Sequence, residues 1–75
     1  MDFLLERGRE LIALEVKTRS RVTSDSFTGL KAIGELSRVR RRIVVYLGNR
    51  ERKTAEGIEI WPLSTFLDRL ANGLF

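Results

Sequence analysis

Two apolar stretches near the start of the chain, residues 2–6 and 10–18, flank a short segment centred on a glycine. Apolar runs on both sides of such a segment predict a β-hairpin. If Gly8 and Arg9 form a two-residue type II′ turn, Gly8 occupies the position that requires a positive φ. The residues that face each other across the two strands then have numbers that sum to 17.

This register sorts the hairpin side chains onto two faces, because successive side chains of a strand point to opposite sides. One face is predicted to be apolar throughout. The other is apolar in the middle, but at one end Asp2 faces Glu15 and Lys17 follows in the same row.

A helix is predicted after a polar loop at residues 19–24, with Thr23 or Ser24 as its N-cap. Apolar residues then recur every third position, which favours a helix that ends near Arg38. These residues are Phe27, Leu30, Ile33 and Leu36.

The second half of the chain predicts two more strands and a closing helix. Residues 42–47 form a β-branched and aromatic run that is typical of a central strand covered on both faces. After a charged loop at 49–56, residues 58–60 predict a short strand that Pro62 stops. Residues 63–74 carry an apolar stripe of helical spacing, with Ser64 as the predicted cap.

The predicted order is therefore β-hairpin, helix, strand, strand, helix, an α/β arrangement around a mixed sheet in a single domain of residues 1–75. The chain begins inside its first strand, and an exposed strand edge is a pairing hazard. We expect a further strand, from a homodimer mate or from a longer parent protein, to cover this edge.

Composition narrows the function classes. The chain has no Cys and no His, which excludes disulfides, thiolate zinc sites and imidazole catalysis. Its longest apolar run is far shorter than the roughly 20 residues of a membrane helix. These features predict a soluble, cytoplasmic protein without a membrane partner and without an organic cofactor.

The net charge is +4, and 11 of the 14 basic residues are Arg, the side chain best suited to bidentate phosphate contacts. This balance is compatible with a DNA partner. It is equally common in soluble domains that bind no nucleic acid.

The facing pair of Asp2 and Glu15 needs compensation, because like charges opposite each other on neighbouring strands lie only about 5 Å apart and repel. A shared proton, the neighbouring Lys17 or a bound cation would each supply it. Mg²⁺ accepts one or two carboxylates while it keeps several waters, and a nearby Lys can orient a water or offset charge on a phosphate. The alternative is that the three charges lie at a solvated strand end, where their pairing contributes little.

The arrangement of Asp2 followed by Glu15-Val16-Lys17 on adjacent strands resembles the D…(D/E)-x-K core of the PD-(D/E)XK nuclease superfamily, which includes restriction enzymes. Over nearly the whole chain, the segments "DFLLERGRELIALEVKTRSRVTSDSFTGLKAI", "RRIVVYLG" and "GIEIWPLS" are similar to a C-terminal domain of unknown function on bacterial and archaeal AAA-type ATPases.

The resemblance implies a restriction-endonuclease-like fold with Mg²⁺-dependent hydrolysis of DNA phosphodiesters. It also makes an ATPase domain of a longer parent protein a candidate to cover the exposed strand edge. Asp2 and Glu15 would be the metal ligands, and Lys17 the catalytic base or electrostatic partner. The chain lacks the helix and strand that precede the Asp strand in the superfamily, so the predicted core is truncated. It also has no G-x-x-x-x-G-K-[ST] loop for ATP.

Four arginines are candidates for nucleic-acid contacts. Arg19 and Arg21 follow Lys17 directly, while Arg41 and Arg42 belong to a basic cluster with Arg38 and Arg40 at the predicted start of the third strand. Solvation of a loop and of a helix-strand junction is the alternative role. The sequence thus leaves three possibilities open: a metal-dependent nuclease, a binding or regulatory module that retains the fold without cleavage, and a dimerisation module.

Overall fold

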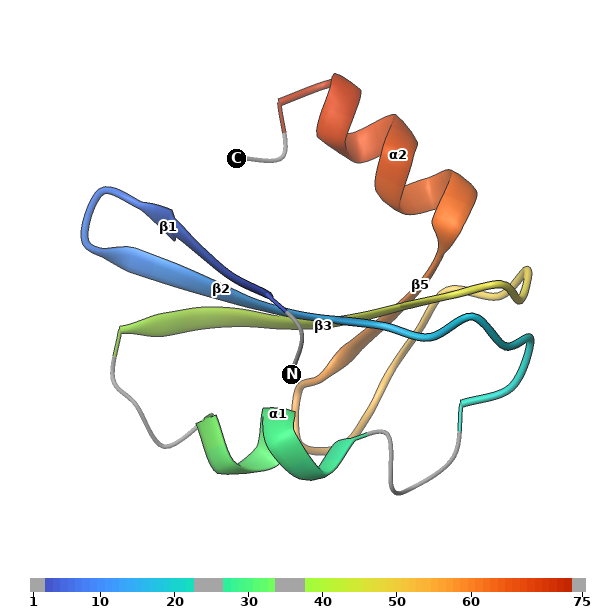
Figure 1. Ribbon diagram of the computed structural model, residues 1–75, viewed down its shortest axis with the longest axis horizontal. Helices are drawn as coiled ribbons and strands as arrows, with labels where there is room; N and C mark the ends of the chain where they lie inside the picture. The colour runs from blue at the N-terminus through green and yellow to red at the C-terminus, as the bar shows by residue number, and fades with distance from the viewer. Residues whose placement is uncertain (1–2, 23–26, 34–37, 74–75) are drawn as a thin grey trace.

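A computed structural model describes residues 3–22, 27–33 and 38–73 (Figure 1). Within these residues the chain forms five strands and two helices. In chain order they are β1 (Phe3–Arg7), β2 (Glu10–Val16), α1 (Thr28–Ile33), β3 (Val39–Tyr46), β4 (Arg52–Lys53), β5 (Glu59–Pro62) and α2 (Leu63–Ala71).

The strands form one mixed sheet in the order β1-β2-β3-β5-β4. The three inner strands β2, β3 and β5 are parallel, and the two edge strands are antiparallel to their neighbours. Figure 1 shows α1 on one face of the sheet and α2 on the other. The predicted α/β class and mixed sheet are thus confirmed.

The hairpin has the predicted register, since Phe3 pairs with Leu14 and Arg7 with Glu10. Gly8 has a φ of +61°, and none of the described residues other than glycine has a positive φ. A type I′ turn would require a positive φ at Arg9 as well, so the backbone agrees with the type II′ assignment.

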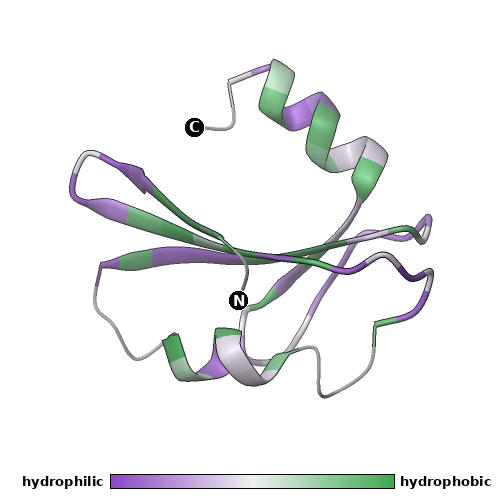
Figure 2. Ribbon diagram, in the orientation of Figure 1, coloured by the Kyte–Doolittle hydropathy of each residue, from purple (hydrophilic) through white to green (hydrophobic). Residues whose placement is uncertain are grey.

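The core consists of two apolar layers, one on each face of the sheet. On the α1 side, Leu30 packs against buried residues of β2, β3 and β5, including Val44 and Tyr46. On the α2 side, Trp61 is fully buried among Ile12, Leu14, Ile43 and Val45, with Phe66 of α2 packed against them. Figure 2 shows hydrophobic residues along β2 and the second half of β3, whereas the start of β3 and the turns are largely hydrophilic.

The central strand extends further than predicted. Strand β3 begins at Val39 and not at residue 42, so the basic residues 40–42 belong to the strand and not to a helix-strand junction. Each of them finds a partner across the sheet or on α1, which offsets the low strand propensity of a charged run. The loop predicted at 49–56 contains a short strand, β4, which pairs with β5.

The last helix also begins differently. Its N-cap is Pro62, and Ser64 lies inside the first turn and makes no capping hydrogen bond. Strand β5 runs into α2 without a loop, because Pro62 has an extended conformation that ends the strand and admits the helix directly after it. The predicted caps Thr23 and Ser24 and the apolar Leu36 lie outside the described residues.

Candidate functional site

The acid and the base predicted for the site lie together at the carboxyl end of β2. Glu15 pairs with Val44 of β3, and the Nζ atom of Lys17 lies 3.1 Å from the Oε1 atom of Glu15. The two residues are separated by one position and therefore point to the same face of the sheet, the one that α1 covers. Glu15 is 8% exposed, whereas the side chain of Lys17 is 32% exposed.

The second predicted carboxylate, Asp2, lies outside the described residues. The described register ends at the pair of Phe3 and Leu14. The pairing of Asp2 with Glu15 therefore stays a prediction, although the part of the hairpin next to it has the register from which it was inferred.

Few described residues at this place could hold a metal ion. Among the described residues, no group of three or more His, Cys, Asp and Glu side chains could hold a metal ion. The described part of the site offers one carboxylate, that of Glu15, and Mg²⁺ binds to one or two protein oxygens with water in the remaining positions. A single carboxylate is compatible with the ligand number of Mg²⁺, whereas a zinc ion takes three or four protein ligands.

The arginines predicted to contact nucleic acid do not form one surface. Arg41 and Arg42 are consecutive in β3 and point to opposite faces of the sheet. Arg41 donates two hydrogen bonds to Glu59, at 3.0 and 2.9 Å, and its guanidinium lies 5.1 Å from the centre of the Trp61 ring. Arg42 donates to the carbonyl oxygens of Leu30 and Glu56. Both side chains thus hold elements of the fold together.

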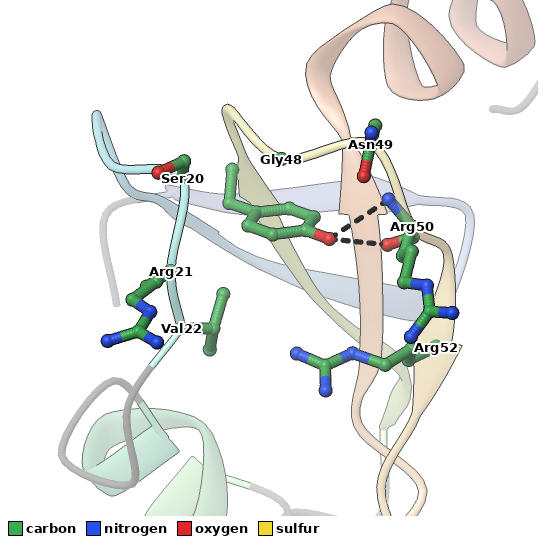
Figure 3. A pocket seen from close by; sticks show the side chains of 8 residues that line it. Ser20, Arg21, Val22, Gly48, Asn49, Arg50 and Arg52 are labelled. Atoms are coloured by element: carbon green, nitrogen blue, oxygen red, sulfur yellow. Dashed lines mark hydrogen bonds between the residues drawn. The ribbon is translucent and has the colours of Figure 1, made fainter.

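The other two predicted arginines lie in the loop after β2. The carbonyl of Arg19 accepts a hydrogen bond of 2.8 Å from the amide of Leu47, which ties this loop to the one after β3. Arg21 lines a pocket of about 430 Å³ between the two loops (Figure 3). Its other lining residues are Ser20, Val22, Tyr46, Gly48, Asn49, Arg50 and Arg52.

The sequence analysis missed Arg50 and Arg52 as candidate site residues. They belong to the segment predicted as a charged loop, and no local spacing relates them to Arg21, which is about thirty positions earlier in the chain. The parallel pairing of β2 with β3 brings the two loops together, because the loops that follow neighbouring parallel strands lie at the same end of the sheet. A predicted parallel pairing could therefore have indicated that Arg21, Arg50 and Arg52 lie near one another.

Two exposed carboxyl groups titrate below their ordinary range. Two hydrogen bonds from the Arg69 guanidinium, at 2.8 and 2.7 Å, lower the pKa of Glu51, and the same contact raises the pKa of Arg69. The pKa of Glu56 is lowered by hydrogen bonds from its own backbone amide and from Thr54, together with the charge of Lys31. Both acids lie close to β4 in the sequence, and each already accepts hydrogen bonds from neighbouring donors.

Within the described residues, none of the helices is long and apolar enough to cross a membrane.

Comparison with models of protein families relates this chain to a known family. The model of a protein family described as "Domain of unknown function (DUF4143)" matches residues 1–66. Searches of the curated proteins and of the solved structures found no match. Because the family model covers most of the sequence, the chain belongs to the DUF4143 family.

Proposed function

We propose that this domain hydrolyses phosphodiester bonds of DNA in a Mg²⁺-dependent reaction, with Glu15 and Asp2 as the metal ligands and Lys17 beside them. The observation that carries the proposal is the contact of 3.1 Å between Lys17 and the nearly buried Glu15 at the end of an inner parallel strand. Ligands of open α/β sheets bind at the carboxyl ends of the strands.

The residues of the chain have distinct parts in this reaction. The carboxylate of Glu15 has a fixed position at the carboxyl end of β2, because this strand is paired on both sides. Lys17 is less buried than Glu15, so its ammonium group can contact a phosphate oxygen or a water from solvent while it stays near the carboxylate. Bound Mg²⁺ would supply Lewis-acid activation of the phosphate and lower the pKa of a coordinated water.

The sequence resemblance supports the same reading. The spacing of Asp2, Glu15 and Lys17 is similar to that of the PD-(D/E)XK nucleases, and the wider similarity is to a C-terminal domain of AAA-type ATPases. Membership of DUF4143 is compatible with this origin but assigns no activity. The proposal therefore depends on the geometry at β2 together with the resemblance.

The test measures metal binding and cleavage in the same set of variants. Calorimetric titration of Mn²⁺ or Mg²⁺ should show binding to the 75-residue chain and its loss in Glu15→Ala, while Glu10→Ala at the other end of β2 serves as the control that removes an equivalent charge. Equal, negligible binding in all three proteins would refute the metal site. Nicking of supercoiled DNA should depend on Mg²⁺ and disappear in Lys17→Ala; nicking that survives this change would point to a contaminant.

A second candidate function is non-catalytic association of two copies through β1. No described strand pairs with the outer side of this edge strand, and Phe3 and Leu4 are 53% and 44% exposed. Next to it, an apolar groove of about 540 Å³ lies between the hairpin and α2, lined by Phe3, Leu5, Glu6, Leu14, Val16, Phe66 and Leu70. Edge-to-edge pairing of two β1 strands would cover both features.

Sedimentation equilibrium separates the two candidates. A dimer that becomes a monomer in Leu4→Lys, without any metal binding by the wild-type chain, would support association as the main function. A wild-type chain that stays monomeric at high concentration would exclude it.

A further inference from the structure

Three arginines line a pocket at one end of the sheet. Arg21 comes from the loop after β2, while Arg50 and Arg52 come from the segment after β3. In Figure 3, Arg21 lies on one side of the opening, and Arg50 and Arg52 lie on the opposite side. The pocket volume of about 430 Å³ exceeds what one small ion needs.

The positive charge of this pocket is not balanced by any carboxylate in the parts of the chain that the structure describes. None of the eight lining residues is acidic, and no carboxylate among the described residues pairs with these three guanidinium groups. Other arginines behave differently, since Arg38 and Arg69 each contact a glutamate within 3.1 Å. Like charges brought to one place without counter-charges favour an anionic ligand.

The backbone that presents Arg50 and Arg52 is held by a buried residue. Tyr46 is 4% exposed, and its hydroxyl donates to the carbonyl oxygen of Arg50 at 2.7 Å and accepts from the Arg50 amide at 3.1 Å. Gly48 allows the loop to fold over this ring, because a Cβ atom at that position would overlap the ring and its hydroxyl. The loop is thus fixed before any ligand binds, which lowers the entropic cost of binding.

The pocket also adjoins the proposed reaction site. Val16 pairs with Val45, and the amide of Lys17 donates to the Val45 carbonyl at 2.8 Å, so Lys17 and Tyr46 follow next on the two strands and point to the same face. Tyr46, which lines the pocket, is therefore the neighbour of Lys17 across the two strands.

We infer that the pocket formed by Arg21, Arg50 and Arg52 binds phosphate groups of a nucleic-acid strand next to Lys17. Guanidinium groups bind phosphate oxygens bidentately, and Ser20 and Asn49 add neutral donors of the kind that commonly contact a nucleic-acid backbone. Such contacts position the strand without reading its sequence. The inference deepens the proposed function and rests on it for the nature of the ligand, but binding through this pocket needs no metal.

The test measures binding of a short, fluorescein-labelled single-stranded oligonucleotide in EDTA by fluorescence anisotropy, at salt concentrations of about 50 to 200 mM. The test variant is Arg50→Ala/Arg52→Ala. Its control is Arg7→Ala/Arg9→Ala, which removes the same charge from the hairpin turn at the far end of the sheet (Figure 1). The Arg50→Lys/Arg52→Lys variant keeps the charge and loses the bidentate geometry.

We expect Arg50→Ala/Arg52→Ala to weaken binding about tenfold or more. The plot of the logarithm of the association constant against the logarithm of the salt concentration should become less steep by about 1.4, which corresponds to two lost phosphate contacts. The hairpin control should change the affinity by no more than about twofold, since its charges lie far from the ligand. The Lys variant should keep the salt slope with a lower affinity.

Three results would overturn the inference. The first is an equal loss of affinity in the pocket and hairpin variants, and the second is competition by polyglutamate as effective as that by unlabelled oligonucleotide. The third is displacement by inorganic phosphate or a mononucleotide at equal phosphate concentration, which would make the pocket a site for a free phosphate compound. Because EDTA excludes cleavage, none of these results depends on whether Glu15 binds a metal.

Discussion

Lys17 and Glu15 form a direct ion pair in which Nζ of the lysine lies 3.1 Å from Oε1 of a glutamate that is almost fully buried. A buried carboxylate loses its hydration, so the neighbouring ammonium group is important for the stability of the folded state. The same pair thus contributes to folding and, in our proposal, to chemistry.

We expect Lys17→Met to lower the free energy of unfolding by about 1 to 2 kcal/mol, because it removes the ammonium group while the carboxylate stays buried. Glu15→Gln should cost less, since a neutral amide has a smaller desolvation penalty. Urea denaturation of both single variants and of the double variant yields the coupling energy. A coupling of about 1 kcal/mol is expected; additive single effects would show that the two side chains do not interact in solution.

The position of this pair could be predicted from the sequence because one local feature determines it. Gly8 is the residue in the hairpin segment that readily adopts a positive φ, and a two-residue turn at Gly8-Arg9 sets the register of every later pair. The placement of Glu15 and Lys17 on one face then follows from the alternation of side chains in β2.

Gly48→Ala should destabilise the fold by about 1 to 3 kcal/mol, since the added methyl group would overlap the ring of the buried Tyr46. Thermal or urea unfolding measures this effect. In a Tyr46→Leu background, which removes the overlapped end of the ring, the same Gly48→Ala change should cost much less. An equal cost in both backgrounds would mean that the backbone conformation of Gly48, and not the contact with Tyr46, causes the loss.

Arg41→Met should lower the free energy of unfolding by about 1 kcal/mol, because it removes both a bidentate pair with Glu59 and a cation–π contact with Trp61. Arg41→Lys should recover only part of this loss, since a lysine cannot form two parallel hydrogen bonds. Chemical denaturation measures both variants. If Arg41→Met left stability unchanged while it weakened oligonucleotide binding, Arg41 would be a ligand contact, as the sequence suggested.

The features that the sequence did not predict depend on contacts between distant segments. Arg50 and Arg52 lie in a segment without hydrophobic periodicity, and contacts with distant residues hold it, among them the pairing of β4 with β5 and the bonds from Tyr46. Ser64 is a good cap by residue type, but the N-cap position is occupied by Pro62, whose side chain has no hydrogen-bond acceptor. Tertiary contacts overrode local preference in both places.

The pair of Glu51 and Arg69 predicts a pH-dependent part of the stability. Hydrogen bonds from Arg69 lower the pKa of Glu51 in the folded protein below its ordinary value of 4.5, so the folded state binds a proton at Glu51 less readily than the unfolded state does. The stabilisation is therefore fully present above pH 4.5 and is lost as the pH falls through the lowered folded pKa. Arg69 stays charged throughout, because the contact raises its pKa.

We expect the difference in unfolding free energy between the wild type and Glu51→Gln to be largest at neutral pH and to shrink as the pH falls below 4.5 and through the lowered folded pKa. Arg69→Met should remove the same pH-dependent difference, although it also removes a contact with the Trp61 ring that does not vary with pH. Adding Glu51→Gln to Arg69→Met should then change the pH profile no further. A pH-dependent effect of Glu51→Gln that persists without Arg69 would show that another group lowers the pKa of Glu51.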